Sequence, residues 1–161
     1  MNDIGKITVS SETINEIYIH ARNEFPSECC GWILGEKNSN LASIVRQAKN
    51  QYSPTNHPSK PDRSSETAYV ISGKDLIELN ESFEKNIVPK IIYHSHPNGK
   101  AYFSETDINN AMSPWGSEPS YPVQQIVIGI NEKEIVQAKQ FAWDYTSKKF
   151  IEINIYLGKK I

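Results

Sequence analysis

The sequence is poor in cysteine: Cys29 and Cys30 are the two among 161 residues, and they are adjacent. Adjacent cysteines are badly placed to pair with each other, and two cannot make a disulfide framework or a four-cysteine zinc knuckle. Long apolar runs are also missing, because no stretch approaches the roughly 18 residues that a membrane helix needs. The opening segment, "MNDIGKITVS", has no apolar signal core. We therefore expect a cytoplasmic protein with no membrane partner.

An excess of positive charge is missing as well. The formal net charge is -2, so the chain has no basic field that would attract nucleic acid. The sequence contains no internal repeats, and its length is typical of one domain. We expect a single domain over residues 1–161 with no nucleic-acid partner.

The apolar periodicity predicts a mixture of helices and strands. A helix is expected over 10–23, where Ile14, Ile17, Tyr18 and Ala21 form one stripe. Further helices are expected over 73–86 and 104–112, and strands over 29–35, 41–49, 67–72, 91–93, 123–130, 135–143 and 149–157. The polar segments 49–66 and 112–122 are expected to be loops. The fold class is therefore α/β (or α+β), with one mixed β-sheet flanked by helices.

The stretch "IIYHSHPNGKAYFSETD" carries the strongest chemical signal. On a strand, side chains alternate between the two faces, so His94 and His96 point the same way and can reach one metal ion. Ser104 is a good N-cap, which puts Asp107 at the third position of a helix, where the dipole favours an ionised carboxylate. Two histidines and one aspartate leave the fourth position of a tetrahedral zinc site open, as in catalytic sites.

Each half of this pattern also has an ordinary explanation. A pair of histidines at a strand end is often a surface feature, and "SETD" alone is a common capping box. The two halves together, at this spacing, favour a metal site. Imidazole and carboxylate suit zinc, while iron, manganese and cobalt stay open.

A hydrolytic zinc site also needs a carboxylate that is not a ligand, to move protons. Glu28 directly precedes the apolar run "CCGWILG", with Pro26 before it and Gly31 after it. A glutamate between a helix and a strand is ordinarily exposed to solvent. On the residues alone, Glu24, Glu66 and Glu105 remain rivals for this role.

The elements "PSECCGWILG", "HSHP", Ser104 and Asp107 resemble the JAMM (MPN+/JAB) metalloproteases. The family motif is a glutamate, then H-x-H, seven residues, Ser, two residues and Asp, and this sequence meets every element. The resemblance implies a JAB/MPN fold akin to cytidine deaminases and a bound Zn²⁺. It also implies that His94, His96 and Asp107 hold the zinc, that Glu28 is the general base and that Ser104 stabilises the oxyanion.

Within that family the sequence looks closest to small bacterial stand-alone members. Those are similar to enzymes that trim or release groups from the C-terminus of ubiquitin-like sulfur-carrier proteins. The implied substrate is a ubiquitin-like or sulfur-carrier protein, cut after a Gly-Gly in its tail. A deubiquitinase-like isopeptidase and a metal-free scaffold that binds partner proteins are the alternatives, although scaffolds usually lose a ligand and this chain retains all of them.

A zinc nucleobase deaminase is a rival from another class, but it would need H-x-E and P-C-x-x-C, and the sequence has neither. The remaining residues receive ordinary interpretations: His57 as a loop residue, His20 as a helix-face residue, Trp32 and the two cysteines as core. Trp115 is either a substrate contact or a packed anchor of its loop.

Overall fold

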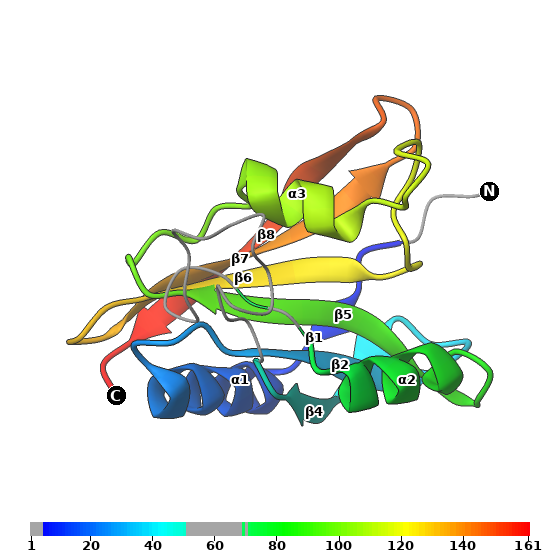
Figure 1. Ribbon diagram of the computed structural model, residues 1–161. Coiled ribbons are helices and arrows are strands. Elements are labelled where there is room, and N and C mark those ends of the chain that lie inside the picture. The colour runs from blue at the N-terminus through cyan, green and yellow to red at the C-terminus, as the bar shows by residue number, and fades with distance from the viewer. Residues whose placement is uncertain (1–4, 51–68, 70) are drawn as a thin grey trace.

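A computed structural model describes residues 5–50, 69 and 71–161 (Figure 1). In chain order the elements of this described part are β1 (Thr8–Val9), α1 (Ser11–Glu24), β2 (Cys30–Glu36), β3 (Leu41–Ala42), β4 (Ile44–Ala48), α2 (Gly73–Ser82), β5 (Ile87–His96), α3 (Glu105–Ala111), β6 (Gln124–Ile130), β7 (Ile135–Asp144) and β8 (Lys149–Lys159). Every helix in these ranges is too short or too polar to span a membrane.

Six of the described strands form one mixed sheet in the order β4-β2-β5-β6-β7-β8. The pairing of β5 with β6 is parallel, and the other neighbours in this sheet are antiparallel. The long strands β5 and β6 run side by side through its middle, and α1 and α3 lie on opposite sides of them in this view (Figure 1). A mixed sheet flanked by helices is the fold class that the sequence predicts.

Apolar side chains of the described residues gather on both faces of the sheet. On one face, Ile17 of α1 packs in a cluster with Ile91 and Tyr93 of β5. On the other face, Leu79 of α2 packs in a cluster with Ile92. Because neighbours on a strand alternate between faces, His94 and His96 belong to the same face as Ile92. The α2 face therefore carries the two histidines.

Most of the expected elements are confirmed, and several differ at their ends. The helix expected over 73–86 ends at Ser82, where Phe83 is the C-cap, and β5 begins as early as Ile87 and includes both histidines. The strand expected over 67–72 falls partly outside the described residues, since only 69, 71 and 72 are described. Ile71 makes only an isolated bridge to Asn50, and Ser72 is instead the N-cap of α2.

The two expected loops have different outcomes. Residues 51–66 of the first lie outside the described part of the chain. The second, 112–122, contains no helix or strand of its own and is closed at its base by a bridge between Met112 and Pro119.

Candidate metal centre

The capping box of α3 places Asp107. Ser104 is the N-cap, and its Oγ accepts a hydrogen bond from the Asp107 N–H at 3.1 Å. In return, Asp107 Oδ2 accepts from the Ser104 N–H at 3.0 Å. Each residue thus fixes the other, as in other capping boxes. The predicted N-cap and third helical position are confirmed, and the carboxylate is held in one orientation.

The same Asp107 oxygen meets both histidines of β5. Asp107 Oδ2 lies 3.2 Å from His94 Nε2 and 3.0 Å from His96 Nε2. The two Nε2 atoms are 3.1 Å apart. Ligand atoms at zinc distances of about 2.0–2.1 Å, arranged tetrahedrally, are about 3.3 Å apart. This triangle of two nitrogens and one oxygen is therefore close to one face of a zinc tetrahedron, so these residues fit the metal.

Two further contacts orient the imidazoles. His96 Nδ1 lies 3.0 Å from the carbonyl oxygen of Lys100. When Nδ1–H donates there, Nε2 of the neutral ring offers its lone pair, the arrangement usual for a metal-binding histidine. His94 is stacked on Tyr69, with ring centroids 4.6 Å apart. Its buried Nδ1 has no hydrogen-bond partner in the described structure.

The surroundings favour the protonation states that a metal requires at His94 and Asp107, but not at His96. Burial lowers the pKa of His94 below its ordinary value, which keeps that ring neutral. Burial alone would raise the pKa of Asp107, but His94 and His96 outweigh it and hold that pKa well below its ordinary value. Burial would lower the pKa of His96, yet the hydrogen bond to Asp107 raises it on balance. A neutral imidazole and an ionised carboxylate are what zinc binds.

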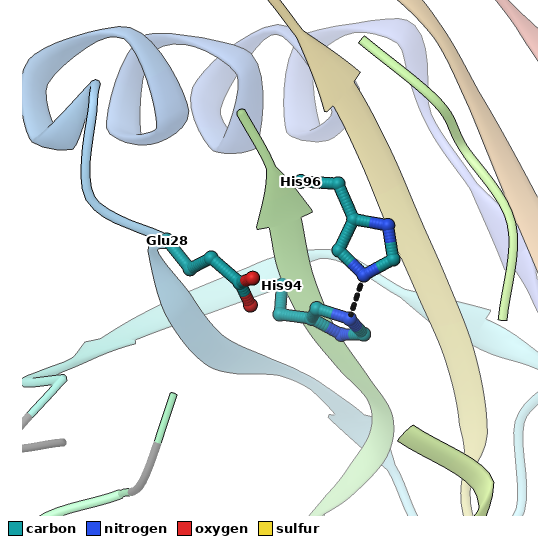
Figure 2. A group of neighbouring side chains, drawn as sticks. All are labelled: Glu28, His94 and His96. Carbon is teal, nitrogen blue, oxygen red and sulfur yellow. Dashed lines mark hydrogen bonds between the residues drawn. The ribbon is translucent and has the colours of Figure 1, made fainter. Parts of the chain in front are cut away.

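Glu28 joins this group from the segment before β2. The antiparallel register pairs Cys30 with His94, and continued by two residues it puts Glu28 beside His96, on the same face. The connection is fixed at Cys29, whose N–H donates to Ser95 Oγ at 2.8 Å and whose carbonyl accepts from the Ser95 N–H. Figure 2 shows the Glu28 carboxylate turned toward the His94 ring.

Glu28 is only 4% exposed, so the ordinary expectation of a solvated glutamate does not apply to it. Of its rivals, Glu24 and Glu105 are exposed, and Glu66 lies outside the described residues. Gly31 permits the close approach of the strands here, because a Cβ at this position would lie 2.6 Å from both Arg46 O and Tyr93 Oη.

The geometry contains two sets of possible ligands that share the histidines. One oxygen of Glu28 and one nitrogen of each histidine all lie within 4.8 Å of one another. Asp107 completes the tighter set, at 3.0 and 3.2 Å. The arrangement therefore offers three atoms for a metal ion and a second carboxylate next to it.

Sequence reasoning missed the residues that support this centre. Tyr69 belongs to a segment interpreted as an ordinary strand, and nothing in "TAYVIS" signals a ring stacked on a histidine. Ser95 sits between the two histidines, where the alternation of a strand turns it away from them. Its hydroxyl bond to the Cys29 N–H depends on strand register, which local sequence does not reveal.

The other interpretations have mixed outcomes. Trp32 and both cysteines are buried, and the cysteines are free, as expected. His20 is buried against the sheet, and its Nδ1 lies 2.7 Å from Tyr93 Oη, because its helix face turns inward. Trp115 is 87% exposed, so the packed-anchor alternative is wrong. His57 lies outside the described residues.

A mixed sheet carrying this site on one face is the JAB/MPN fold, and solved structures agree. The structure is similar to the crystal structure of a JAB1/MPN domain protein from Archaeoglobus fulgidus, with a TM-score of 0.53, 12% identity and coverage of 96% of this chain and 99% of that chain. It is also similar to the solution structure of a protein from Desulfitobacterium hafniense, with a TM-score of 0.62, 20% identity and coverage of 95% and 92%. These likenesses establish the fold.

The chain belongs to the Prok-JAB family, the prokaryotic homologs of the JAB domain, whose model matches residues 10–143. It is also similar to proteins named CysO-cysteine peptidase from Mycobacterium tuberculosis and Mycobacterium bovis. Each is 30% identical over 110 residues, which are 67% of this chain and 67% of the relative. The resemblance that the sequence motif predicts is therefore confirmed at the level of the family.

Proposed function

We propose that this protein is a zinc-dependent metallopeptidase that hydrolyses an amide bond after a Gly-Gly in the C-terminal tail of a ubiquitin-like or sulfur-carrier protein. The convergence of His94 Nε2, His96 Nε2 and Asp107 Oδ2 within 3.2 Å of one another, with the buried Glu28 carboxylate alongside, carries the proposal. The name of the mycobacterial relatives, CysO-cysteine peptidase, supports peptidase chemistry of this kind.

His94, His96 and Asp107 would hold the zinc. Zinc supplies Lewis acidity, which polarises a carbonyl and lets water give up a proton near neutral pH. The capping box and the Lys100 carbonyl keep two of the ligands oriented without the metal, so little order has to be gained on binding.

Glu28 takes up the proton of the attacking water on its carboxylate and returns it to the leaving nitrogen. Its burial suits this role, because a carboxylate screened from bulk water exchanges protons with the reacting atoms rather than with solvent. Ser104 Oγ accepts a hydrogen bond from the Asp107 N–H. The proton of the Ser104 hydroxyl is therefore left free to be donated elsewhere. The hydroxyl is available to the oxygen that becomes negative as the amide is attacked.

The surface beside the centre supports an extended substrate. A cavity of about 310 Å³ adjoins it, since Tyr69 both stacks on His94 and lines that cavity, together with Ile92 and Ala111. The cavity is lined by Leu76 of α2 and Ala111 of α3. A substrate chain that passes the buried metal centre must have small residues at the scissile bond, and glycines meet that need. Larger side chains at other positions of the substrate tail can occupy the cavity.

Two other functions are the alternatives to this proposal. A deubiquitinase-like isopeptidase would use the same residues on a bond to a lysine side chain. A non-catalytic scaffold would bind a partner without a metal, and the retention of every motif residue disfavours it.

To test the substrate, we would incubate the protein with Gly-Gly-tailed carrier proteins and determine the products by intact mass. The proposal predicts release of the residues or adduct that follow Gly-Gly. Replacement of the second glycine by valine should abolish cleavage, because a β-branched side chain does not fit at the metal. Equal cleavage of the valine carrier would indicate a more general peptidase.

A further inference from the structure

Lys90, on β5, is an unusual lysine. It is 8% exposed, and within the described structure it has no ion pair or hydrogen bond. Lys90 Nζ is not among the buried polar atoms of the described residues that lack a partner, so the stem of the side chain is buried while the ammonium still reaches water. Burial accordingly lowers the pKa of Lys90. The buried stem therefore holds, at a defined place on the surface, an ammonium group without a protein partner among the described residues.

A β-bulge turns Lys90 out of the regular pairing. The register of β2 with β5 pairs Ile33 with Ile91 but Leu34 with Pro89, so Lys90 is the residue left without a partner. Bulges commonly re-aim a side chain. The lysine stem lies on Gly35: a Cβ built there would be 3.1 Å from Lys90 Cδ and 1.9 Å from the Leu41 carbonyl oxygen. The absence of a side chain at 35 leaves space for this stem.

Lys90 lines a cavity of about 340 Å³ that is rich in hydrogen-bond donors. Lys37, Ser39 and Asn40 line it as well, and no carboxylate is among the described residues of its wall. Ser39 Oγ accepts a hydrogen bond from the Leu41 N–H at 3.1 Å, so its own proton is left to donate. The rest of the wall is apolar and includes Phe83 and Pro122.

This cavity is separate from the metal centre. Lys90 precedes His94 by four residues on β5, about 13 Å along a strand. None of the residues that line the cavity is among the motif residues.

We propose that this cavity is a second binding site, for a small oxyanion, a carboxylate or phosphate ester, carried on a compact apolar body. The two ammonium groups, with the hydroxyl and amide beside them, provide charge-assisted hydrogen bonds to the anion. The apolar wall packs on the remainder of the ligand. A volume of about 340 Å³ lies at the small end of ligand pockets. An anion bound here supplies the partner that Lys90 lacks.

The test uses the zinc-loaded protein and phenyl phosphate as the probe, followed by amide chemical shifts in ¹⁵N-labelled protein. The proposal predicts saturable shifts at residues 37–40 and at Val88 and Lys90, and weaker binding of inorganic phosphate, which has no apolar body. Benzoate in a parallel titration distinguishes a carboxylate from a phosphate preference, and phenol, which is uncharged, should not bind.

Lys90→Met should weaken binding of phenyl phosphate about tenfold or more, while Lys133→Met, at an exposed lysine outside the cavity, should leave it unchanged. Lys37→Met provides a second variant if Lys90→Met does not fold. Absence of saturable shifts overturns the proposal. So does equal affinity in the wild type and the lysine variant, which is what binding at the zinc or a merely solvated Lys90 would give.

Discussion

Asp107 Oδ2 lies 3.0 Å from His96 Nε2 although the two residues belong to different elements, the first turn of α3 and the end of β5. That relationship predicts where the metal binds. The purified protein should hold about one zinc per chain, and Asp107→Asn should lose most of it, because an amide is a poor ligand in place of a carboxylate. Elemental analysis would measure this, with Glu105→Gln, an exposed neighbour, as the control. If Asp107→Asn retained its full zinc content, Asp107 would not be the third ligand, and Glu28 would take its place in the assignment.

Glu28→Gln should keep the fold and the zinc but lose turnover. Only the capacity to move a proton is removed, and general acid–base steps are worth about 10²–10⁴-fold in rate. Turnover of a tailed carrier and zinc content should be determined on the same preparation. Near wild-type turnover would exclude Glu28 as the base, whereas loss of zinc would indicate that Glu28 is a ligand.

Ser104→Ala should have two effects that separate experimentally. Loss of the N-cap bond to Asp107 costs roughly 1 kcal/mol of unfolding free energy. Loss of a donor to the oxyanion costs about 10²–10³ in turnover. Thermal unfolding measures the first effect, and turnover at a temperature where the variant is fully folded measures the second. A variant that is destabilised but has normal turnover would show that Ser104 acts only as a helix cap.

The stability of the fold should depend on pH through Asp75. Its carboxylate joins α2 to Arg46 of β4 and to Lys49, the residue after β4. Burial alone would raise its pKa, but the Lys49 N–H at 2.9 Å and the Arg46 guanidinium at 2.8 Å lower it below its ordinary value. A carboxylate with a lowered pKa stabilises the fold above its unfolded pKa of about 3.9 and loses that contribution as the pH falls through the folded pKa.

Asp75→Asn should therefore lower the unfolding free energy by about 1–3 kcal/mol at neutral pH, and the deficit should shrink as the pH falls below about 3.9. Urea unfolding over a pH series would show this, with the exposed Glu132→Gln as the matched change of charge. A deficit that stays constant over the whole series would assign the effect to packing.

Sequence patterns predicted the parts of the site that depend on local rules. The alternation of a strand put His94 and His96 on one face, and the capping box placed Asp107, both confirmed by the geometry. What the sequence could not reveal depends on contacts between distant segments. The burial of Glu28 follows from the pairing of β2 with β5, and the stacking of Tyr69 on His94 joins residues 25 positions apart. The bulge at Lys90 likewise has no local signature.

The position of a helix end and the exposure of Trp115 also depend on contacts that the local sequence does not reveal. The helix expected to reach residue 86 ends at Ser82, with Phe83 packed against the core as its C-cap, an outcome decided by tertiary contact. Trp115 could not be placed from composition, since an aromatic residue in a loop packs or projects according to what lies beneath it.

One measurement tests the central claim most directly: the intact mass of a Gly-Gly-tailed carrier incubated with three preparations of the protein, namely zinc-loaded, chelator-treated, and chelator-treated with zinc restored. We predict loss of the mass beyond Gly-Gly with the first and third preparations and an unchanged carrier with the second. The same product from all three preparations, or an unchanged carrier throughout, would contradict a zinc peptidase acting on such tails.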